Sequence, residues 1–505
     1  MIRSGACALA ALSAAAIAAQ PIRPEASVIR ASSRLVQVNV IVRDKSGPVT
    51  TLTKDDFVLA DRGKPQVIQE FSVETPGDAA PDQMLPANTF SNHPARVPAN
   101  TTVVLLDGLN TRFENQAHAK RELMKFLAAV DPTGRIALYT LGKTLRVLCD
   151  FDRPDQLQRI LAPYKGIAAT DFATAEPDHS NTGSDILDPF IDAANQAFVT
   201  ATSVDRAGIT VQAFRAIANH LARVPGRKNL VWVTGSTPFS VAGAARALNG
   251  ADIAVYPVDA RGLVGLPPEL TAVASGGRTR SAVSFRPGGL DTMEELADQT
   301  GGRAFFDTND LSQAIRSAVD DSEVTYSLGF YPDDASLDGK FHELKVRVDR
   351  AGVQLRYRKG YVASAEAASS AQEARSSLLA AISSPLESAA IPLTATVELV
   401  KGNSIKIHWT TDISHLQMAA QGPFRVAEIT LLLVQQDAAG KLLDSSKGVF
   451  KIRLTGEAYE SDLKSGAKFN SYVQPKDGLA SLRMVVVDRS NAVAGSLLIP
   501  LSRVK

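Results

Sequence analysis

The sequence contains very little cysteine: only Cys7 and Cys149 occur in 505 residues. Cys7 lies in an N-terminal segment that we interpret below as a cleaved signal peptide, which would leave Cys149 alone. A single thiol cannot form an intrachain disulfide, and a zinc site built on paired cysteines is also excluded. Cys149 lies in an apolar run, which favours a buried, inert thiol over a reactive one.

An excess of charge of either sign is also missing. The 54 Lys and Arg residues against 53 Asp and Glu residues give a net charge of +1. There is no long basic run, so the composition provides no sequence-wide field that would attract nucleic acid. We therefore expect no nucleic-acid partner.

Motifs of known catalytic sites are absent from the sequence. The seven histidines are scattered, and there is no His-Glu-x-x-His, P-loop or Gly-x-Ser-x-Gly motif. Residues 235–237 (GST) follow a predicted strand but lack the second glycine of a nucleophile elbow. Residues 178–180 (DHS) are neighbours in sequence, which does not create triad geometry. We therefore predict that the protein is not an enzyme, and a hydrolase is kept only as a third alternative.

The N-terminus has the pattern of an export signal. Arg3 supplies a positive charge, and residues 6–19 form a short apolar stretch with small residues before Gln20. Such a stretch is too short for a transmembrane helix and is typical of a signal peptide, which we assign to residues 1–19. We expect an exported protein that is periplasmic, on the cell surface or extracellular. No other run is long and apolar enough to predict a transmembrane span.

Alternating apolar and polar residues predict β-structure on both sides of a central region. The pattern predicts an N-terminal β unit over 34–75 and further strands over 321–362, each small for an independent core. We expect the 321–362 strands to complete a β-sandwich with the N-terminal unit. Residues 76–99 are rich in Pro, Ala, Asp and Asn and are predicted to be a linker. A helical linker is expected over 363–389, followed by an all-β sandwich over 390–505.

The central region, residues 100–320, alternates apolar runs with amphipathic helical patterns. We predict strands at 102–106, 136–141, 145–151, 230–233 and 253–258, and helices that include 114–130 and 206–224. Thr292 and Glu295 predict a capping box for another helix, and the glycine pair 301–302 predicts its end. This alternation favours an α/β domain with a mostly parallel sheet between two layers of helices. Such sheets carry their working residues on the loops beyond the carboxyl ends of the strands.

Four stretches of the central region resemble a von Willebrand factor type A domain. Residues 102–111 (TVVLLDGLNT) resemble its first strand and loop, and 225–235 (PGRKNLVWVTG) the strand after its long helix. Residues 255–262 (VYPVDARG) resemble the next strand, and 295–306 (ELADQTGGRAFF) the last helix and strand. With the β pattern up to residue 361, the chain is similar to bacterial exported VWFA-related proteins abundant in acidobacteria. The resemblance covers residues 30–362 and implies a Rossmann-like α/β fold.

The resemblance also implies a divalent cation, Mg²⁺ or Ca²⁺, at the carboxyl edge of the sheet. Family domains hold it with an Asp-x-Ser-x-Ser motif, a Thr from a second loop and an Asp from a third. Asp107 matches the first ligand and Thr111 replaces the second Ser, but Leu109 stands at the first Ser and residues 234–236 lack the Asp. Further candidate oxygen ligands are Asn110, Thr170, Ser184 and Asp259.

Because the motif is incomplete, two expectations stay open: the protein has no cofactor, or it binds a divalent cation. The alternative to a metal site is that Asp107 and Thr111 cap the helix that follows them. Asp259 and Arg261 are close enough in sequence to form an ion pair at the same edge.

The sequence as a whole favours a non-enzymatic binding module with a protein partner, in adhesion or complex assembly. We expect its strand-end loops to make the contact with the partner, with or without the assistance of a metal ion. The alternative is a structural envelope scaffold with a metal-free A-like domain. Exposed polar side chains around Asp107 would favour the binding module, and a packed apolar edge around Leu109 would favour the scaffold.

Overall fold

The first strands of the chain pair with strands that come much later in the sequence. β1 (Val36–Asp44) lies antiparallel to β12 (Thr325–Phe330), and β3 (Phe57–Asp61) lies antiparallel to β13 (Asp338–Val348). This computed structural model describes residues 35–75, 85–92, 101–130, 136–166, 206–224, 226–237, 242–262, 289–306, 310–321, 324–332, 338–364, 370–400 and 404–504.

These early and late strands form two sheets around one apolar core. Within the described residues, one sheet has the order β14-β1-β12-β5, with β2 beside β1, and the other has the order β15-β13-β3-β4. Side chains from both sheets, such as Val38, Tyr326, Leu59 and Leu344, pack together in this core. The remaining elements are β2 (Gly47–Pro48), a 3-10 helix (Lys54–Asp56), β4 (Lys64–Gln66), β5 (Glu70–Glu74), β14 (Gln354–Arg356) and β15 (Gly360–Ser364).

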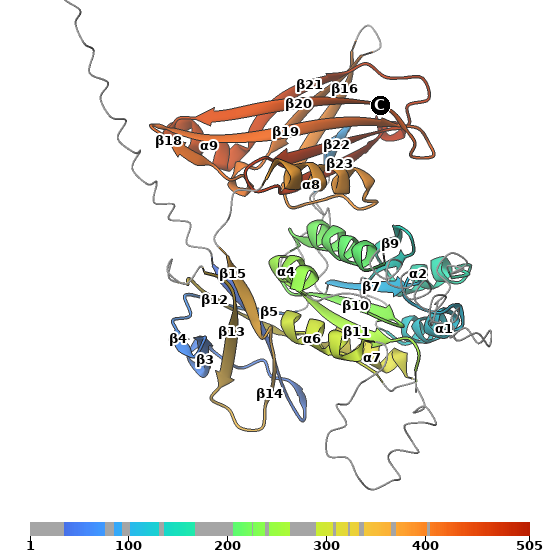
Figure 1. Cartoon of the computed structure of the whole chain (residues 1–505), viewed down its shortest axis with the longest axis vertical. Helices are drawn as coiled ribbons and strands as arrows, with labels where there is room; N and C mark the ends of the chain where they lie inside the picture. Colours follow the sequence, from blue (N-terminus) through green and yellow to red (C-terminus); the bar gives the residue numbers. More distant parts are fainter. Residues whose placement is uncertain are drawn as a thin grey trace, which may run out of the picture. The chain divides into compact units, whose positions relative to one another are not determined.

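The sheet of the central region is mostly parallel (Figure 1). Its described order is β11-β10-β7-β8-β9, in which β9 alone runs antiparallel to its neighbour β8. A parallel bridge between Val258 and Phe305 adds one more segment beside β11. Read in chain order this is 3-2-1-4-5-6, the Rossmann-like arrangement that the sequence predicts. The strands are β7 (Thr101–Asp107), β8 (Ile136–Leu141), β9 (Leu145–Asp152), β10 (Lys228–Thr234) and β11 (Ile253–Asp259).

Helices cover both faces of this parallel sheet. Val103 and Leu105 of β7 point into one core, whereas Val104 and Leu106 point into the other. Burial on both faces explains why the strands are continuous apolar runs without alternation. The first core lies against the helix over 206–221, α4 (Ala242–Gly250) and α6 (Leu290–Thr300). The second lies against α1 (Phe113–Ala129), α2 (Pro154–Leu161) and α7 (Leu311–Asp320).

The C-terminal region consists of two further antiparallel sheets that share a core. Their described orders are β21-β17-β16-β6 and β18-β19-β22-β23, with β20 also paired to β19. The strands are β16 (Leu393–Val400), β17 (Ser404–Thr411), β18 (Ala419–Gln421), β19 (Phe424–Gln436), β20 (Leu442–Leu454), β21 (Ala467–Val473), β22 (Ser481–Asp488) and β23 (Ala494–Pro500). The helices are α8 (Ala371–Ser383), which packs on the second sheet, α9 (Gly456–Ser465) and two 3-10 helices, Ile413–His415 and Leu501–Arg503.

The linker predicted over 76–99 is partly wrong. Within it, β6 (Thr89–Ser91) pairs with β16, and Phe90 is only 5% exposed in the C-terminal core. The Asn92 side chain then donates hydrogen bonds to the carbonyl oxygens of Ser388 at 2.7 Å and Ile391 at 2.9 Å. A three-residue strand is too short to produce a periodic signal, which is why the sequence reads as a linker. The signal peptide predicted over 1–19 lies outside the described residues.

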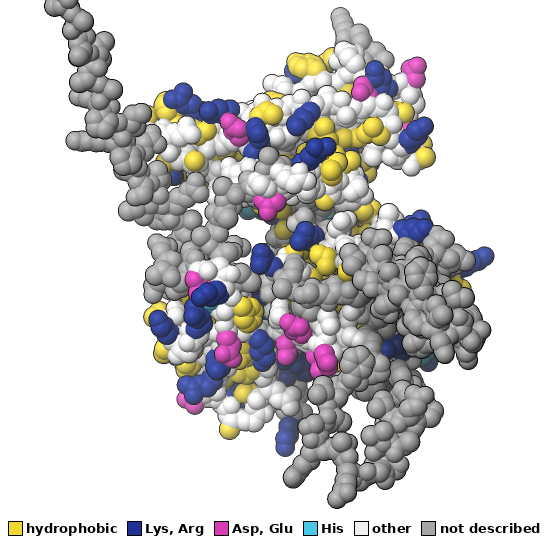
Figure 2. All heavy atoms as spheres, in the orientation of Figure 1, with side chains coloured by type: hydrophobic (Ala, Val, Ile, Leu, Met, Phe, Trp, Pro, Cys, Tyr) yellow, Lys and Arg dark blue, Asp and Glu magenta, His cyan; other side chains and the backbone are white. Residues whose placement is uncertain are grey.

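The described surface carries charges of both signs. On the face seen in Figure 2, Lys and Arg side chains are interspersed with Asp and Glu, in agreement with the net charge of +1. Among the described helices, none is both long enough and apolar enough to cross a membrane.

Candidate functional site

The candidate site lies where the strand order of the parallel sheet reverses. Asp107 ends β7 and Thr234 ends β10, and these two strands lie side by side. From this pair the chain builds the sheet outward in both directions, which makes it the topological switch point. Open α/β sheets place their ligands beyond the carboxyl ends of the strands at this point.

The carboxylate of Asp107 is enclosed by hydrogen-bond donors. The residue is 2% exposed, and its Oδ1 accepts a bond of 3.0 Å from the backbone N–H of Asn110. Its Oδ2 accepts three bonds, from Asn110 Nδ2 at 2.8 Å and from Trp232 Nε1 and Thr234 Oγ1 at 3.0 Å each. Burial raises the pKa of Asp107, and the hydrogen bonds from Asn110, Trp232 and Thr234 oppose that rise. An indole or amide N–H can only donate, so these partners favour the ionised carboxylate, which is an acceptor only.

The loops that leave β7 and β10 are bonded directly to each other. The backbone N–H of Gly235 donates to Thr111 Oγ1 at 2.9 Å, and Ser236 Oγ donates to the Asn110 carbonyl at 3.2 Å. A Cβ on Gly235 would lie 3.2 Å from the Asn110 oxygen and 3.3 Å from Thr111 Cα. The loop after β10 therefore has little room for the carboxylate side chain that the family places there.

The helix-cap interpretation of Asp107 and Thr111 is wrong. The N-cap of α1 is Arg112, and no side chain caps this helix. Asp107 accepts instead from the turn before the helix, and Thr111 accepts from the loop after β10. Arg112 occupies the N-cap, so Asp107 lies five residues and Thr111 one residue before that position.

Two other positions at this edge, Leu109 and Asp259, are engaged elsewhere in the described residues. Leu109 is 4% exposed and packs into the apolar core of the α/β domain. Asp259 is bound to Arg261, whose Nε lies 2.9 Å from Oδ1 and whose Nη2 lies 2.8 Å from Oδ2, so the predicted ion pair is confirmed. Thr170 and Ser184 lie outside the described residues.

The described residues do not fit a divalent cation at this edge. Such an ion needs about six oxygen ligands. The Oδ2 atom of Asp107 already accepts three hydrogen bonds, Leu109 and Gly235 offer no side-chain oxygen, and Asp259 is paired. Across the ranges that the structure describes, no group of three or more His, Cys, Asp or Glu residues could hold a metal ion.

The space beside Asp107 is also small. A cavity of about 10 Å³ lies among Asp107, Gly108, Thr111, Gln116 and Tyr164. This is close to the minimum for one water molecule, whereas ligand pockets usually measure roughly 300–1,000 Å³. This cavity is therefore too small for a substrate.

An exposed aromatic side chain marks the outer side of the same edge. Phe113, the first residue of α1, is 51% exposed. The preceding loop is fixed to the neighbouring strand, because the backbone N–H of Leu109 donates to the Leu141 carbonyl at 3.0 Å. Phe113 is therefore held at the carboxyl end of the sheet by the same loop that surrounds Asp107. Sequence reasoning missed it because Phe113 lies just before the helix predicted over 114–130, where the pattern gives no indication of exposure.

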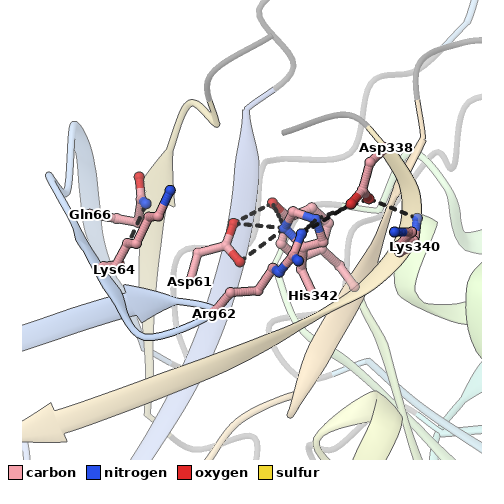
Figure 3. A network of polar contacts seen from close by, with 8 residues as sticks. Asp61, Arg62, Lys64, Gln66, Asp338, Lys340 and His342 are labelled. Carbon is pink, nitrogen blue, oxygen red and sulfur yellow. Dashed lines mark hydrogen bonds and ion pairs between the residues drawn. The ribbon is translucent and has the colours of Figure 1, made fainter. Parts of the chain in front are cut away.

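A second polar cluster lies in the N-terminal β unit (Figure 3). His342 Nδ1 lies 3.0 Å from Asp61 Oδ1, and its Nε2 lies 3.2 Å from Asp338 Oδ1. Tyr361 donates to Asp61 at 2.8 Å, and Arg62 pairs with Asp338 at 3.0 Å. Burial and the hydrogen bond to Asp61 raise the pKa of Tyr361 well above its usual range. The cluster joins β3, β13 and β15, which indicates a structural role within that sheet.

His220 connects the helix over 206–221 with β9. Its Nε2 lies 3.1 Å from Asp150 Oδ2, and its Nδ1 lies 2.9 Å from the Glu387 carbonyl. Tyr139 donates to the other oxygen of Asp150 at 2.6 Å. Burial lowers the pKa of His220, but the Asp150 carboxylate and the Glu387 carbonyl outweigh burial and raise the pKa overall.

This arrangement predicts a pH-dependent contribution to stability. Because the folded pKa of His220 is raised above its usual 6.5, the contribution is complete below that value and is lost as pH rises through the folded pKa. We expect the urea midpoint of the parent to fall toward that of His220→Gln as pH increases from mildly acidic to mildly alkaline. Urea unfolding of both proteins across this range measures the difference. A constant gap between the two midpoints would contradict the assignment.

Comparison with known proteins gives only distant similarity. No protein-family model matches the chain, and no curated protein matches it. An aerotolerance-related membrane protein from Bacteroides fragilis NCTC 9343, carrying multiple mutations to serines, is 12% identical over 44% of this chain and 98% of its own, with a TM-score of 0.26. A von Willebrand factor type A structure from Catenulispora acidiphila is 10% identical over 86% of this chain and 74% of its own, with a TM-score of 0.25. The ArnB paralog VWA2 from Sulfolobus acidocaldarius is 9% identical over 88% and 76%, with a TM-score of 0.22.

At these TM-scores the three likenesses carry no argument about fold or function. The Rossmann-like character of the α/β domain follows from its own strand order and from the burial of both sheet faces.

Proposed function

We propose that the chain is an exported, non-enzymatic protein-interaction module of the von Willebrand A type, acting in adhesion or complex assembly. Its partner would bind at the carboxyl edge of the parallel sheet, and the contact would not need a metal. The β-structures on either side would form sandwiches, the first of them interrupted by the α/β domain, and would act as spacers or additional contacts. The pairing of β1 with β12 and of β3 with β13 supports this architecture.

The exposed side chain of Phe113 carries the proposal for the contact surface. Large aromatic residues supply much of the binding energy at protein interfaces when a partner encloses them. Phe113 is held in place by the bonded loop before it, so little conformational entropy is lost on binding. The small cavity beside Asp107 supports a surface contact over an enclosed small-molecule substrate. The partner would offer an apolar recess to the Phe113 ring.

The test compares two exposed apolar residues on different parts of the chain. Immobilised full-length parent, Phe113→Ser and Leu399→Ser proteins are incubated with an envelope extract of the source organism. Leu399 is the matched control because it is 66% exposed on β16, away from the parallel sheet. We expect Phe113→Ser to reduce recovery of the bound protein about tenfold or more, as for an interface hot spot, and Leu399→Ser to leave it unchanged.

The same incubation in Mg²⁺ and in EDTA tests metal dependence, and equal recovery is expected. If Phe113→Ser and Leu399→Ser both recover the partner as the parent does, the carboxyl edge is not the contact surface. The scaffold alternative would then be the better description.

A further inference from the structure

We infer that the hydrogen bonds to Asp107 form a latch that takes the place of a divalent cation in closing this edge of the sheet. The latch consists of Asp107, Asn110, Trp232 and Thr234, together with the bond between Gly235 and Thr111. The inference concerns the chain itself and holds whether or not a partner binds at Phe113.

The charge of Asp107 requires compensation inside the fold. The carboxylate is buried, and its described hydrogen-bond partners include no Lys or Arg side chain. A buried charge is tolerated only when it is paired, coordinates a metal or accepts several hydrogen bonds. Four donors from two adjacent strand ends supply that compensation here. They occupy the carboxylate in the way that a cation would.

The same donors exclude a cation from Asp107. A metal ion on Oδ2 would have to displace bonds from Asn110, Trp232 and Thr234. Trp232 is completely buried, so its displaced indole N–H would lose its partner without gaining water. A metal ion would therefore displace hydrogen bonds that already balance the charge of Asp107. The described residues would supply it with few oxygen ligands.

The latch also fixes the two loops relative to each other. Asn110 donates both to Asp107 and to Thr210 Oγ1, at 2.8 and 2.9 Å, so that it ties the loop after β7 to the helix over 206–221. Thr234 lies next to Gly235, which donates to Thr111. The edge is thus held in one arrangement by the protein alone, independent of the concentration of divalent ions.

The first experiment asks whether the full chain binds metal. Calorimetric titration with Mg²⁺, Mn²⁺ and Ca²⁺ is expected to show no saturable binding, and the melting temperature is expected to be the same in EDTA and in excess Mg²⁺. Asp107→Asn is the control variant, because its side-chain oxygen can still accept the three hydrogen bonds that Asn110, Trp232 and Thr234 donate to Oδ2 of Asp107. Saturable binding to the parent that is lost in Asp107→Asn would overturn the inference.

The second experiment asks whether the donors hold the edge together. Thr234→Val removes the hydroxyl group that bonds Asp107 and the Ser236 backbone without a change in shape, and Thr234→Ser keeps this hydroxyl group. We expect the valine variant to melt several degrees below the parent, and the serine variant to melt closer to the parent than the valine variant does. Equal melting temperatures for the parent and Thr234→Val would overturn the latch, whatever the outcome of partner binding at Phe113.

Discussion

Replacing Asp107 with Ala is expected to lower the free energy of unfolding of the α/β domain by about 3–5 kcal/mol, because several buried donors would each be left unsatisfied at a cost of about 1–3 kcal/mol. Ala accepts no hydrogen bond, so Trp232 Nε1 and two N–H groups of Asn110 would lose their acceptor, whereas the Thr234 hydroxyl keeps the Ser236 carbonyl at 2.9 Å. Burial raises the pKa of Asp107, which means that the fold disfavours the charge, so removal of the charge offsets part of this cost.

The Asp107→Asn variant separates the loss of acceptors from the loss of charge. An Asn oxygen at the Oδ2 position keeps three of the four bonds, whereas its NH₂ group faces the backbone N–H of Asn110. We expect a loss of about 1–3 kcal/mol, as for one buried donor left unsatisfied. Amide hydrogen exchange of β7 and β10 measures the local stability of the α/β domain in both variants, separately from the stability of the β-structures. Equal losses for Ala and Asn would show that the four donors do not depend on Asp107.

Gly302→Ala is the second substitution with a large expected effect. α6 ends at Thr300, and Gly301 follows with a φ of 79°. A Cβ on Gly302 would lie 1.8 Å from the carbonyl oxygen and 2.7 Å from the carbonyl carbon of Val255, in the middle of β11. Because the backbone of β11 cannot shift without breaking its hydrogen bonds to β10, we expect a loss of about 3 kcal/mol or more.

Gly250→Ala provides the matched control for that substitution. Gly250 ends α4, and a Cβ added there meets no atom within 4 Å. Ala is a better helix former than Gly, so this variant is expected to be unchanged or stabilised by up to about 1 kcal/mol. Chemical unfolding of both variants, followed by exchange of the β11 amides, compares them. Similar stability of the two would mean that α6 does not approach β11 as closely as described.

Much of the α/β domain can be predicted from the sequence because its strands are buried on both faces. The predicted strands at 136–141 and 253–258 match β8 and β11 closely, and the glycine at 301 ends α6 as predicted. The capping box of Thr292 and Glu295 is wrong. α6 begins earlier, at Leu290, after Gly289 with a φ of 76°, and no side chain caps it. A Thr-x-x-Glu spacing also occurs inside helices, so the pattern alone does not locate the first turn.

Other parts of the fold lack a local signal. α4 has the sequence AGAARALNG and shows no wide apolar stripe, yet Ala244, Ala245 and Leu248 pack into the core. Small side chains let this helix approach the sheet, and the packing of such a helix depends on the surface it meets. The same limit applies to β6, which is defined by its partner β16.

The position of the candidate site in the fold could be predicted from the sequence, but the hydrogen bonds around Asp107 could not. Asp107 and Thr111 lie where the motif predicts, at the carboxyl edge of the sheet. The donor role of Trp232 depends on the side-chain rotamer of a residue on the neighbouring strand, and its sequence context indicated only a core position. Thr210 likewise reaches the site from a helix distant in sequence. Contacts between elements of this kind become visible only when the strand order is known.

The pairing of the first strands with late ones sets the order in which the chain can fold. β1 and β3 find their partners only after β12 and β13 have been synthesised. The parallel sheet between them is complete in sequence before β12 emerges, so it can form while the N-terminal strands still lack their neighbours. During synthesis, residues 36–61 therefore lack their strand partners for longer than any part of the α/β domain, and we expect a chaperone to bind this segment first.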